Sequence, residues 1–324
     1  MSRALVVRAL SDDLSTLKME DRALPAPGRG ELKVRLRAAS VNFPDILMVQ
    51  GKYQLKPELP FSPGMEGAGD VVAVGDGVAR VKMGDKVVFG SRFGCYAEEI
   101  VVPEAAVRAL PRGFDYAKGA AYPAAYLTAY VGLVRRGTLL AGETLLVHGA
   151  AGGVGLAAVD LGKLLGATVI ATASSDEKRA FLTSYGADHV LPSSGFREAV
   201  KDLTQGRGAD VIYDPVGGDV FDESVRCIAF GGRLLVIGFT SGRIPTVSVN
   251  MPLIKGFSVV GVRAGEYGRQ FPAKGVENIR AIDAWAAEGK IRPHVCAALP
   301  LERALEAMAM LQNRKVIGKV VLTM

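Results

Sequence analysis

The sequence predicts an α/β fold in which a doubly wound parallel sheet is inserted into a β-rich domain. Three observations lead to this prediction: a length of 324 residues, a change of rhythm near residue 124, and six apolar runs that follow it. A chain of this length exceeds the usual size of one compact hydrophobic core, so we expect two domains.

The β-rich part runs from the N-terminus to about residue 123. Short β-branched runs alternate there with Gly and Pro turns, as at residues 32–36, 70–75 and 86–89. Such runs, bounded by such turns, are typical of strands in a small irregular β domain.

From about residue 124, continuous apolar runs alternate with helical segments. Strands of this kind are buried on both faces, which indicates a parallel sheet covered by helices on each side. The six expected strands lie at residues 145–147, 169–171, 190–191, 211–213, 234–237 and 259–262.

After about residue 263 the pattern predicts a helical stretch through Trp285, an amphipathic helix near residues 300–308 and a final strand at 319–322. We expect this strand to rejoin the β-rich domain. We therefore assign residues 1–123 and 264–324 to the substrate-binding β-rich domain. Residues 124–263 are assigned to the nucleotide-binding domain.

Composition narrows the classes of partner. The chain is 49% hydrophobic and 22% charged, and its net charge of +6 comes from scattered basic residues. The sequence has no basic stripe of the kind that indicates nucleic-acid binding. It also shows no signal peptide and no apolar run of about 18 residues that would indicate insertion into a membrane. Cys95, Cys227 and Cys296 are isolated, so we expect a reducing, cytoplasmic compartment.

The strongest local motif is the run Thr-Leu-Leu-Val-His-Gly-Ala-Ala-Gly-Gly-Val-Gly at residues 144–155. A strand enters a Gly-rich turn, and a helix follows. Glycines allow the backbone to approach a pyrophosphate, and the helix N-terminus offers unpaired N–H groups. Because the motif lies between a strand and a helix of an α/β pattern, it predicts a Rossmann-type dinucleotide site.

The next expected strand indicates which nicotinamide cofactor binds. NAD sites usually place a carboxylate at its end, but this strand ends Ala-Thr-Ala-Ser-Ser at residues 171–175. Lys178 and Arg179 follow, on a helix that we expect Ser174 to cap with Glu177. A 2′-phosphate would meet a hydroxyl, a helix N-terminus and a lysine, which favours NADPH, although Asp176 and Glu177 oppose it.

Several motifs together extend this prediction along nearly the whole chain. They are Ser-Val-Asn-Phe-Pro-Asp at 40–45, Pro-Gly-Met-Glu-Gly-Ala-Gly at 63–69, Leu-Thr-Ala-Tyr at 127–130, the glycine turn, Tyr-Asp-Pro-Val-Gly-Gly at 213–218, and Arg314 through Gly318-Lys319. With these motifs the chain resembles the zeta-crystallin-like quinone oxidoreductases of the medium-chain dehydrogenase/reductase superfamily. The resemblance implies a GroES-like domain with an inserted Rossmann domain and NADPH in the cleft between them.

The resemblance also implies cofactor-binding residues. Thr128 is expected on the nicotinamide side. The pyrophosphate would be held by Gly152, Gly153 and Val154, and the 2′-phosphate by Ser174, Lys178 and Arg314. Phe239 and Ser241 would lie along the cofactor. Relatives often have a tyrosine after the third strand, where this chain has Pro192 and Ser193, so Ser193 is a weaker match.

Zinc-dependent relatives need about three protein ligands at the catalytic metal. Here Met65 replaces the usual histidine of a Gly-His-Glu segment, the N-terminal cysteine ligand is missing, and so is the four-cysteine lobe. The three histidines are expected to be ordinary strand-end or surface residues. We therefore expect no metal, which disfavours simple alcohol–aldehyde interconversion.

A conjugated acceptor needs less electrophilic help, because the charge left by hydride addition delocalises onto an oxygen. The resemblance places Asn42, Asp45 and Tyr53 at the nicotinamide end of the cleft. Tyr53 is expected to donate to the oxyanion or to pack in its loop, Asn42 to orient ribose or substrate, and Asp45 to organise the loop. A tyrosine common in the bacterial pocket, two residues after the aspartate, is replaced by Leu47.

Three functions remain open: a quinone reductase, a reductase of activated C=C bonds in enones or acryloyl and enoyl thioesters, and a nucleotide-binding protein with little catalysis. The intact polar residues disfavour the third. Relatives often dimerise through the last Rossmann strand, which corresponds to the apolar run at residues 258–262. We therefore expect a homodimer.

Overall fold

The computed structural model describes all 324 residues. They form two compact units: unit 1 comprises residues 1–124 and 293–324, and unit 2 comprises residues 125–292. The chain therefore leaves unit 1 once and returns to it, as expected for an inserted domain.

The contacts place residues 264–292 in unit 2, whereas the sequence analysis assigned them to the β-rich domain. The polar contacts of α10 (Pro272–Ala287) give the physical reason. Nε of Arg135 donates to the side-chain oxygen of Asn278 at 2.7 Å, and the Trp285 ring packs on Tyr130 with centroids 5.5 Å apart. These long-range contacts leave no sequence pattern that would mark the boundary.

Unit 1 is built around a mixed, seven-stranded sheet in the order β14-β15-β3-β4-β5-β7, with β6 also pairing with β3. The C-terminal strand β15 pairs antiparallel with β3, and Val321 lies opposite Ser40, which confirms that the tail rejoins this domain. A separate hairpin joins β1 to β2. The strands are β1 (Ser2–Val7), β2 (Leu17–Arg22), β3 (Glu31–Ser40), β4 (Glu66–Val74), β5 (Lys86–Gly90), β6 (Glu99–Pro103), β7 (Val107–Ala109), β14 (Val295–Pro300) and β15 (Lys319–Thr323).

Alternation along β3 shows how this unit builds its core. Leu32, Val34 and Leu36 are buried, whereas the residues between them are at least partly exposed. The helices of the unit are α1 (Phe43–Val49), α2 (Tyr116–Ala121) and α11 (Ala304–Gln312), with short 3-10 turns η1 (Glu104–Ala106) and η3 (Leu301–Arg303). The buried β3 residues share one hydrophobic core with α1 and α11.

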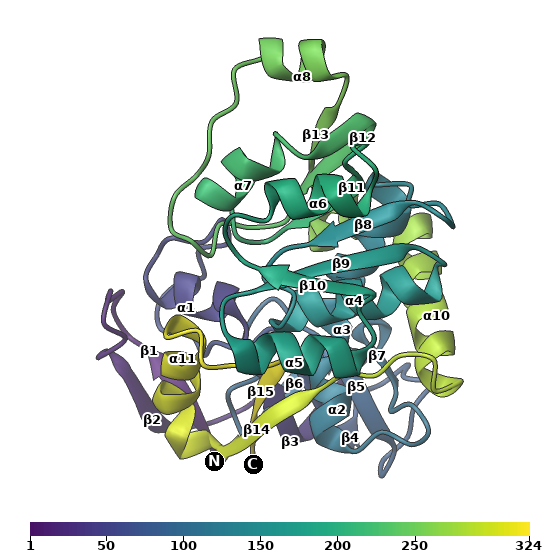
Figure 1. Cartoon of the computed structure of the whole chain (residues 1–324). Coiled ribbons are helices and arrows are strands. Elements are labelled where there is room, and N and C mark those ends of the chain that lie inside the picture. The colour runs from purple at the N-terminus through teal and green to yellow at the C-terminus, as the bar shows by residue number, and fades with distance from the viewer. The chain divides into compact units, whose positions relative to one another are not determined.

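Unit 2 contains the predicted parallel sheet. All six expected strands are present, in the order β10-β9-β8-β11-β12-β13, and every neighbouring pair is parallel (Figure 1). This order is that of a Rossmann fold, in which the strand sequence reverses next to the first strand. The strands are β8 (Thr144–Val147), β9 (Thr168–Ala173), β10 (His189–Pro192), β11 (Ala209–Asp214), β12 (Ile228–Val236) and β13 (Ser258–Gly261).

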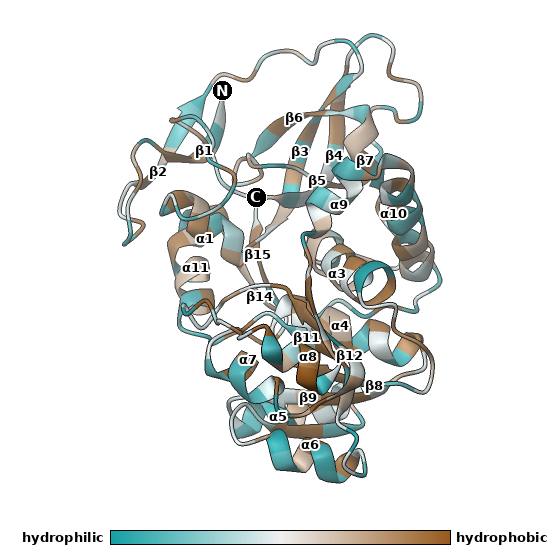
Figure 2. Ribbon diagram, turned by 90° about the horizontal axis from the view of Figure 1, so that it is seen from above, coloured by the Kyte–Doolittle hydropathy of each residue, from teal (hydrophilic) through white to brown (hydrophobic).

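Burial explains why these strands read as continuous apolar runs. All four residues of β8 are buried, and Figure 2 shows β8, β11 and β12 mainly in brown, whereas α5 and α6 carry teal residues. The remaining helices are α3 (Pro123–Tyr130), which continues into the π-helical turn η2 (Val131–Arg136), α4 (Gly153–Leu164), α5 (Asp176–Tyr185), α6 (Arg197–Leu203), α7 (Asp219–Ser224), α8 (Asn250–Lys255), α9 (Ala264–Gln270) and α10.

Candidate active site and dinucleotide-binding turn

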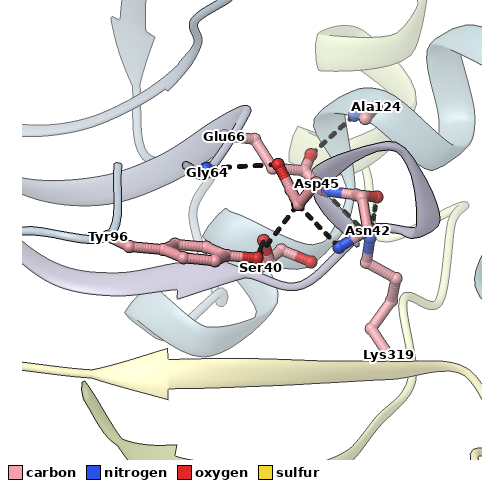
Figure 3. Close-up of polar contacts among 8 residues, drawn as sticks. All are labelled: Ser40, Asn42, Asp45, Gly64, Glu66, Tyr96, Ala124 and Lys319. Carbon is pink, nitrogen blue, oxygen red and sulfur yellow. Dashed lines mark hydrogen bonds and ion pairs between the residues drawn. The ribbon is translucent and has the colours of Figure 1, made fainter. Parts of the chain in front are cut away.

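The first candidate site lies in unit 1, where the chain leaves β3 and enters α1. Asn42 caps this helix in an extended conformation, and its backbone N–H donates to Oδ2 of Asp45 at 2.9 Å. The Asp45 carboxylate also accepts from the backbone N–H of Gly64 at 3.1 Å and from the hydroxyl of Tyr96 at 2.9 Å (Figure 3). Asp45 is fully buried and joins three segments of the chain.

The burial of Asp45 has an electrostatic consequence. Burial raises the pKa of its carboxyl to about 7, against the opposing effects of the Asn42 N–H, the Tyr96 hydroxyl and the Lys319 charge. Burial and the neighbouring Asp45 also raise the pKa of Tyr96 well above its ordinary value, so its hydroxyl stays protonated. Asp45 is therefore the acceptor of a stable Tyr96 hydrogen bond.

Glu66, the first residue of β4, organises the other half of this network. Its Oε1 accepts from Nζ of Lys319 at 3.0 Å and from Nδ2 of Asn42 at 2.9 Å, while Oε2 accepts from the backbone N–H of Ala124 at 2.7 Å. Nζ of Lys319 also donates to Oδ1 of Asn42 at 2.6 Å. We call the five residues Asn42, Asp45, Glu66, Tyr96 and Lys319 the Glu66 cluster (Figure 3).

The structure brings Asn42 and Asp45 together but adds partners that the sequence analysis did not assign. Glu66 and Lys319 belong to two of the motifs on which the family resemblance rests, and membership of these motifs was the signal that could have identified them from the sequence. Tyr96 stood in no motif. Tyr53 packs, partly buried, against the core of unit 1, and Tyr96 is the tyrosine that donates to Asp45.

The glycine turn of unit 2 forms the second candidate site. It leads from β8 into α4, whose N-cap is Gly152, and no side chain caps this helix. The first helical bond runs from the Leu156 N–H to the Gly152 carbonyl at 2.8 Å, so the N–H groups of residues 153–155 have no partner within the helix. A Cβ on Gly155 would lie 2.4 Å from the Gly149 carbonyl oxygen, so only glycine permits this close approach.

These features fit a dinucleotide pyrophosphate. Unpaired N–H groups, an uncapped helix N-terminus and the absence of large or charged side chains at the turn are what an anionic phosphate pair requires. Gly152, Gly153 and Val154 all belong to this turn. The backbone of α4 would bind the phosphates without any charged side chain.

His148 precedes this turn and is fully buried. Its Nε2 lies 2.8 Å from Oγ of Ser224 and its Nδ1 lies 3.0 Å from Oγ1 of Thr172. The Ser224 hydroxyl donates to the Val220 carbonyl at 2.6 Å, so Nε2 carries the proton and Nδ1 accepts from Thr172. Burial lowers the pKa of His148 to about 3, which keeps the ring neutral. We call His148, Thr172 and Ser224 the His148 cluster.

The end of β9 corrects one expectation. Ser175, not Ser174, caps α5, because its side chain accepts from the Lys178 N–H at 3.3 Å. Helical backbone begins at Asp176, one residue later than the expected capping box requires. Ser174 is exposed, and Arg179 bonds the Asp176 carboxylate and the Ala173 carbonyl.

The other residues assigned by resemblance lie in one helix and in three connecting segments. In unit 2, Thr128 lies in α3, Ser193 follows β10, and Phe239 and Ser241 are exposed in the loop after β12. In unit 1, Arg314 follows α11, is exposed and has a positive φ of 54°.

No group of three or more His, Cys, Asp or Glu side chains is arranged to hold a metal ion. None of the helices is long and apolar enough to cross a bilayer.

A Rossmann unit with an uncapped glycine turn and a β-rich unit with a buried polar cluster define the class of two-domain dehydrogenases and reductases. Residues 28–112 match the family described as alcohol dehydrogenase GroES-like domain, and residues 153–280 match the family described as zinc-binding dehydrogenase.

Comparison with known proteins identifies the family. The chain is 39% identical over 91% of its length to a quinone oxidoreductase-like protein 2 homologue of Nematostella vectensis, covering 82% of that protein. The Escherichia coli quinone oxidoreductase, solved with NADPH, has a TM-score of 0.91 and 29% identity, with all of both chains covered. The CurF ER cyclopropanase from the curacin A biosynthetic pathway has a TM-score of 0.90 and 27% identity over 100% of this chain and 99% of that one. The chain belongs to the quinone oxidoreductase-like family of the medium-chain dehydrogenase/reductase superfamily, and it is an oxidoreductase.

Proposed function

We propose that the chain is an NADPH-dependent, metal-independent reductase that transfers hydride to quinones. The observation that carries this proposal is the uncapped glycine turn before α4, in a chain similar over its full length to a quinone oxidoreductase solved with NADPH. The nicotinamide cofactor, when bound, supplies the hydride. The residues of this chain bind it, orient the acceptor and stabilise the charge that develops on the acceptor oxygen.

The preference for NADPH rests on the end of β9. No carboxylate follows the strand directly, and Ser174 is exposed because Ser175 serves as the helix cap. Asp176, the nearest acid, is bonded to Arg179, which reduces its repulsion toward a phosphate. We assign Ser174, Lys178, Ser193 and Arg314 to the 2′-phosphate, and Thr128, Phe239 and Ser241 to the rest of the cofactor.

In unit 1 the proposed reaction uses Asn42 and Tyr53 directly. Asn42 would orient the acceptor or the cofactor ribose, and Tyr53 would donate a hydrogen bond to the developing oxyanion. Asp45 is fully buried, so we assign it the positioning of the loop that carries Asn42. Water would complete the protonation of the product.

A second candidate function is the reduction of activated C=C bonds in enones or in acryloyl or enoyl thioesters. The similarity to CurF ER favours it, since that protein is named for an enoyl reductase domain. An enolate is a stronger base than the anion of a hydroquinone, so this reaction would depend more on the Tyr53 donor.

A substrate panel tests both functions. NADPH oxidation would be followed with a benzoquinone, a naphthoquinone, an enone and acryloyl-CoA, with and without a metal chelator. We expect the largest kcat/KM with a quinone and no effect of the chelator. A preference for the enone or thioester would select the second candidate, and loss of activity with stoichiometric bound zinc would refute metal independence.

We further propose a homodimer formed through the edge of the parallel sheet. β13 is the last strand of that sheet, and large apolar side chains are exposed near it: Phe230, Val249, Leu253, Ile254 and Val259. Phe230 is 86% exposed and Leu253 is 82% exposed, and α8 projects from the sheet in Figure 1. Pairing of two β13 strands would bury this surface. Light scattering should give twice the chain mass of 34.1 kDa, and a monomer at micromolar concentration would contradict the proposal.

For the location we propose the cytoplasm. All three cysteines are free thiols and two of them are buried, which fits a reducing compartment. Fractionation of cells that express a tagged chain tests this, and recovery in an oxidising compartment would contradict it.

A further inference from the structure

The side-chain amide of Asn42 is held between two opposite charges. Its Oδ1 accepts from the Lys319 ammonium at 2.6 Å, and its Nδ2 donates to the Glu66 carboxylate at 2.9 Å. We propose that Lys319 and Glu66 are positioning residues that fix the orientation of this amide for the reaction. This inference rests on the proposed role of Asn42.

The charges select one of the two orientations of the amide. If the amide were rotated by half a turn, its NH₂ group would face the ammonium and its oxygen would face the carboxylate. Both contacts would then be repulsive, in a region where Glu66 is fully buried and the Lys319 side chain is 7% exposed. A neutral pair of the same size would leave both orientations available.

The backbone explains why the ammonium reaches this position. Lys319 begins β15, and its N–H donates to the His294 carbonyl at 2.9 Å. The preceding Gly318 has a φ of 75°, and a Cβ there would lie 2.3 Å from the same carbonyl oxygen, so the residue must be glycine. The Val41 N–H donates to the Val320 carbonyl at 2.9 Å, which holds Asn42 beside this strand.

Glu66 connects the oriented amide to a second element. Its other oxygen accepts from the Ala124 N–H at 2.7 Å, in the first turn of α3. The same helix carries Thr128 four residues later. With one N–H used by Glu66, the Asn42 amide keeps a second N–H, and the direction of this donor is defined by the pair.

The decisive variant removes both charges together. Lys319→Met with Glu66→Gln leaves no unpaired buried charge, so the protein is expected to fold where Lys319→Met alone is strongly destabilised. In this neutral-pair variant we expect kcat to fall about tenfold while the Kd for NADPH changes less than about twofold, as for the loss of one oriented hydrogen bond. The matched control is Lys290→Met with Glu288→Gln, an exposed ion pair, and it should leave kcat unchanged.

Two measurements separate positioning from general stability. In the Asn42→Ala background, the neutral-pair substitutions should change kcat by less than about twofold, because their effect passes through Asn42. Hydrogen exchange of the Asn42 side-chain amide, followed by NMR on asparagine-labelled protein without cofactor, should become at least about tenfold faster in the neutral-pair variant.

The outcomes distinguish this inference from the proposed function. A folded neutral-pair variant with wild-type kcat and wild-type amide exchange would overturn the positioning role. An equal loss of kcat with and without Asn42 would also overturn it. If Asn42→Ala kept full activity while amide exchange still depended on the pair, the catalytic role of Asn42 would fail and the positioning would stand.

Discussion

The Glu66 cluster of unit 1 and the His148 cluster of unit 2 satisfy their buried polar groups in opposite ways. The Glu66 cluster of unit 1 encloses an ion pair, since Glu66 is completely buried beside the Lys319 ammonium. The His148 cluster of unit 2 is neutral, and its imidazole is satisfied by two hydroxyl groups. A neutral cluster needs only hydrogen bonds, whereas a buried charge needs a partner of opposite sign. The two clusters should therefore respond differently to mutation and to pH.

The largest expected difference is in the cost of losing one partner. Lys319→Met would leave the Glu66 carboxylate buried without its cation, and we expect the free energy of unfolding to fall by about 3–5 kcal/mol. Ser224→Ala would leave only the His148 N–H unpaired, which costs about 1–3 kcal/mol. Chemical denaturation followed by circular dichroism measures both. Equal losses would show that the two clusters do not differ in the way we describe.

The second difference is in the sign of the pH dependence. Asp45 has a folded-state pKa of about 7, above its ordinary value of 3.8, so the folded protein holds this proton longer and loses stability as pH rises from about 4 to 7. His148 has a folded-state pKa of about 3, below its ordinary value of 6.5, so the protein loses stability as pH falls through that range. Between pH 4.5 and 6.5 the two contributions oppose each other.

Single variants should reveal how Asp45 and His148 each make the free energy of unfolding depend on pH. Relative to Asp45→Asn, the wild type should lose about 1.4 kcal/mol per pH unit as pH rises from 4.5 to 6.5. Relative to His148→Gln, it should gain about the same amount. Denaturation curves across this range provide the test, and constant differences with pH would contradict the assigned protonation states. The constant offset caused by each substitution does not affect the slope.

The third expected effect is on catalysis rather than stability, and it concerns unit 1. If Tyr53 of unit 1 bonds the oxyanion, Tyr53→Phe should slow the reduction of an alkene ten- to a hundredfold, or roughly 1.4–2.7 kcal/mol of barrier. The effect on a quinone should be smaller, because its reduced anion is a weaker base. The Kd for NADPH should hardly change. Steady-state kinetics on one quinone and one enone checks this, and unchanged turnover on both would leave Tyr53 as a packing residue.

The fourth expected effect belongs to the cofactor residues of unit 2. The wild type should bind NADPH at least about tenfold more tightly than NADH, because a charge-assisted hydrogen bond contributes roughly 1.5–3 kcal/mol. Lys178→Ala should remove much of that preference without changing kcat at saturating NADPH. Fluorescence titration with both cofactors measures the ratio. Equal dissociation constants in the wild type would refute the assignment of NADPH.

The sequence alone determined the elements whose signals are local. The parallel sheet, the glycine turn before α4 and the returning C-terminal strand were predicted, because apolar periodicity and glycine spacing are set by neighbours in the chain. The same local rules failed at the end of β9, where Ser174 and Ser175 are chemically identical candidates for the cap. Only the point at which β9 ends and helical backbone begins decided that Ser175 caps α5.

Tertiary structure decided the partners of the buried charges. Lys319 and Glu66 lie 253 residues apart in sequence, and Tyr96 lies 51 residues from Asp45, so no local pattern relates them. The contacts of residues 264–292 with unit 2 have the same origin. A buried charge specifies that some partner of opposite sign must be present, but the folded sheet determines which residue that is, by bringing β15 beside β3.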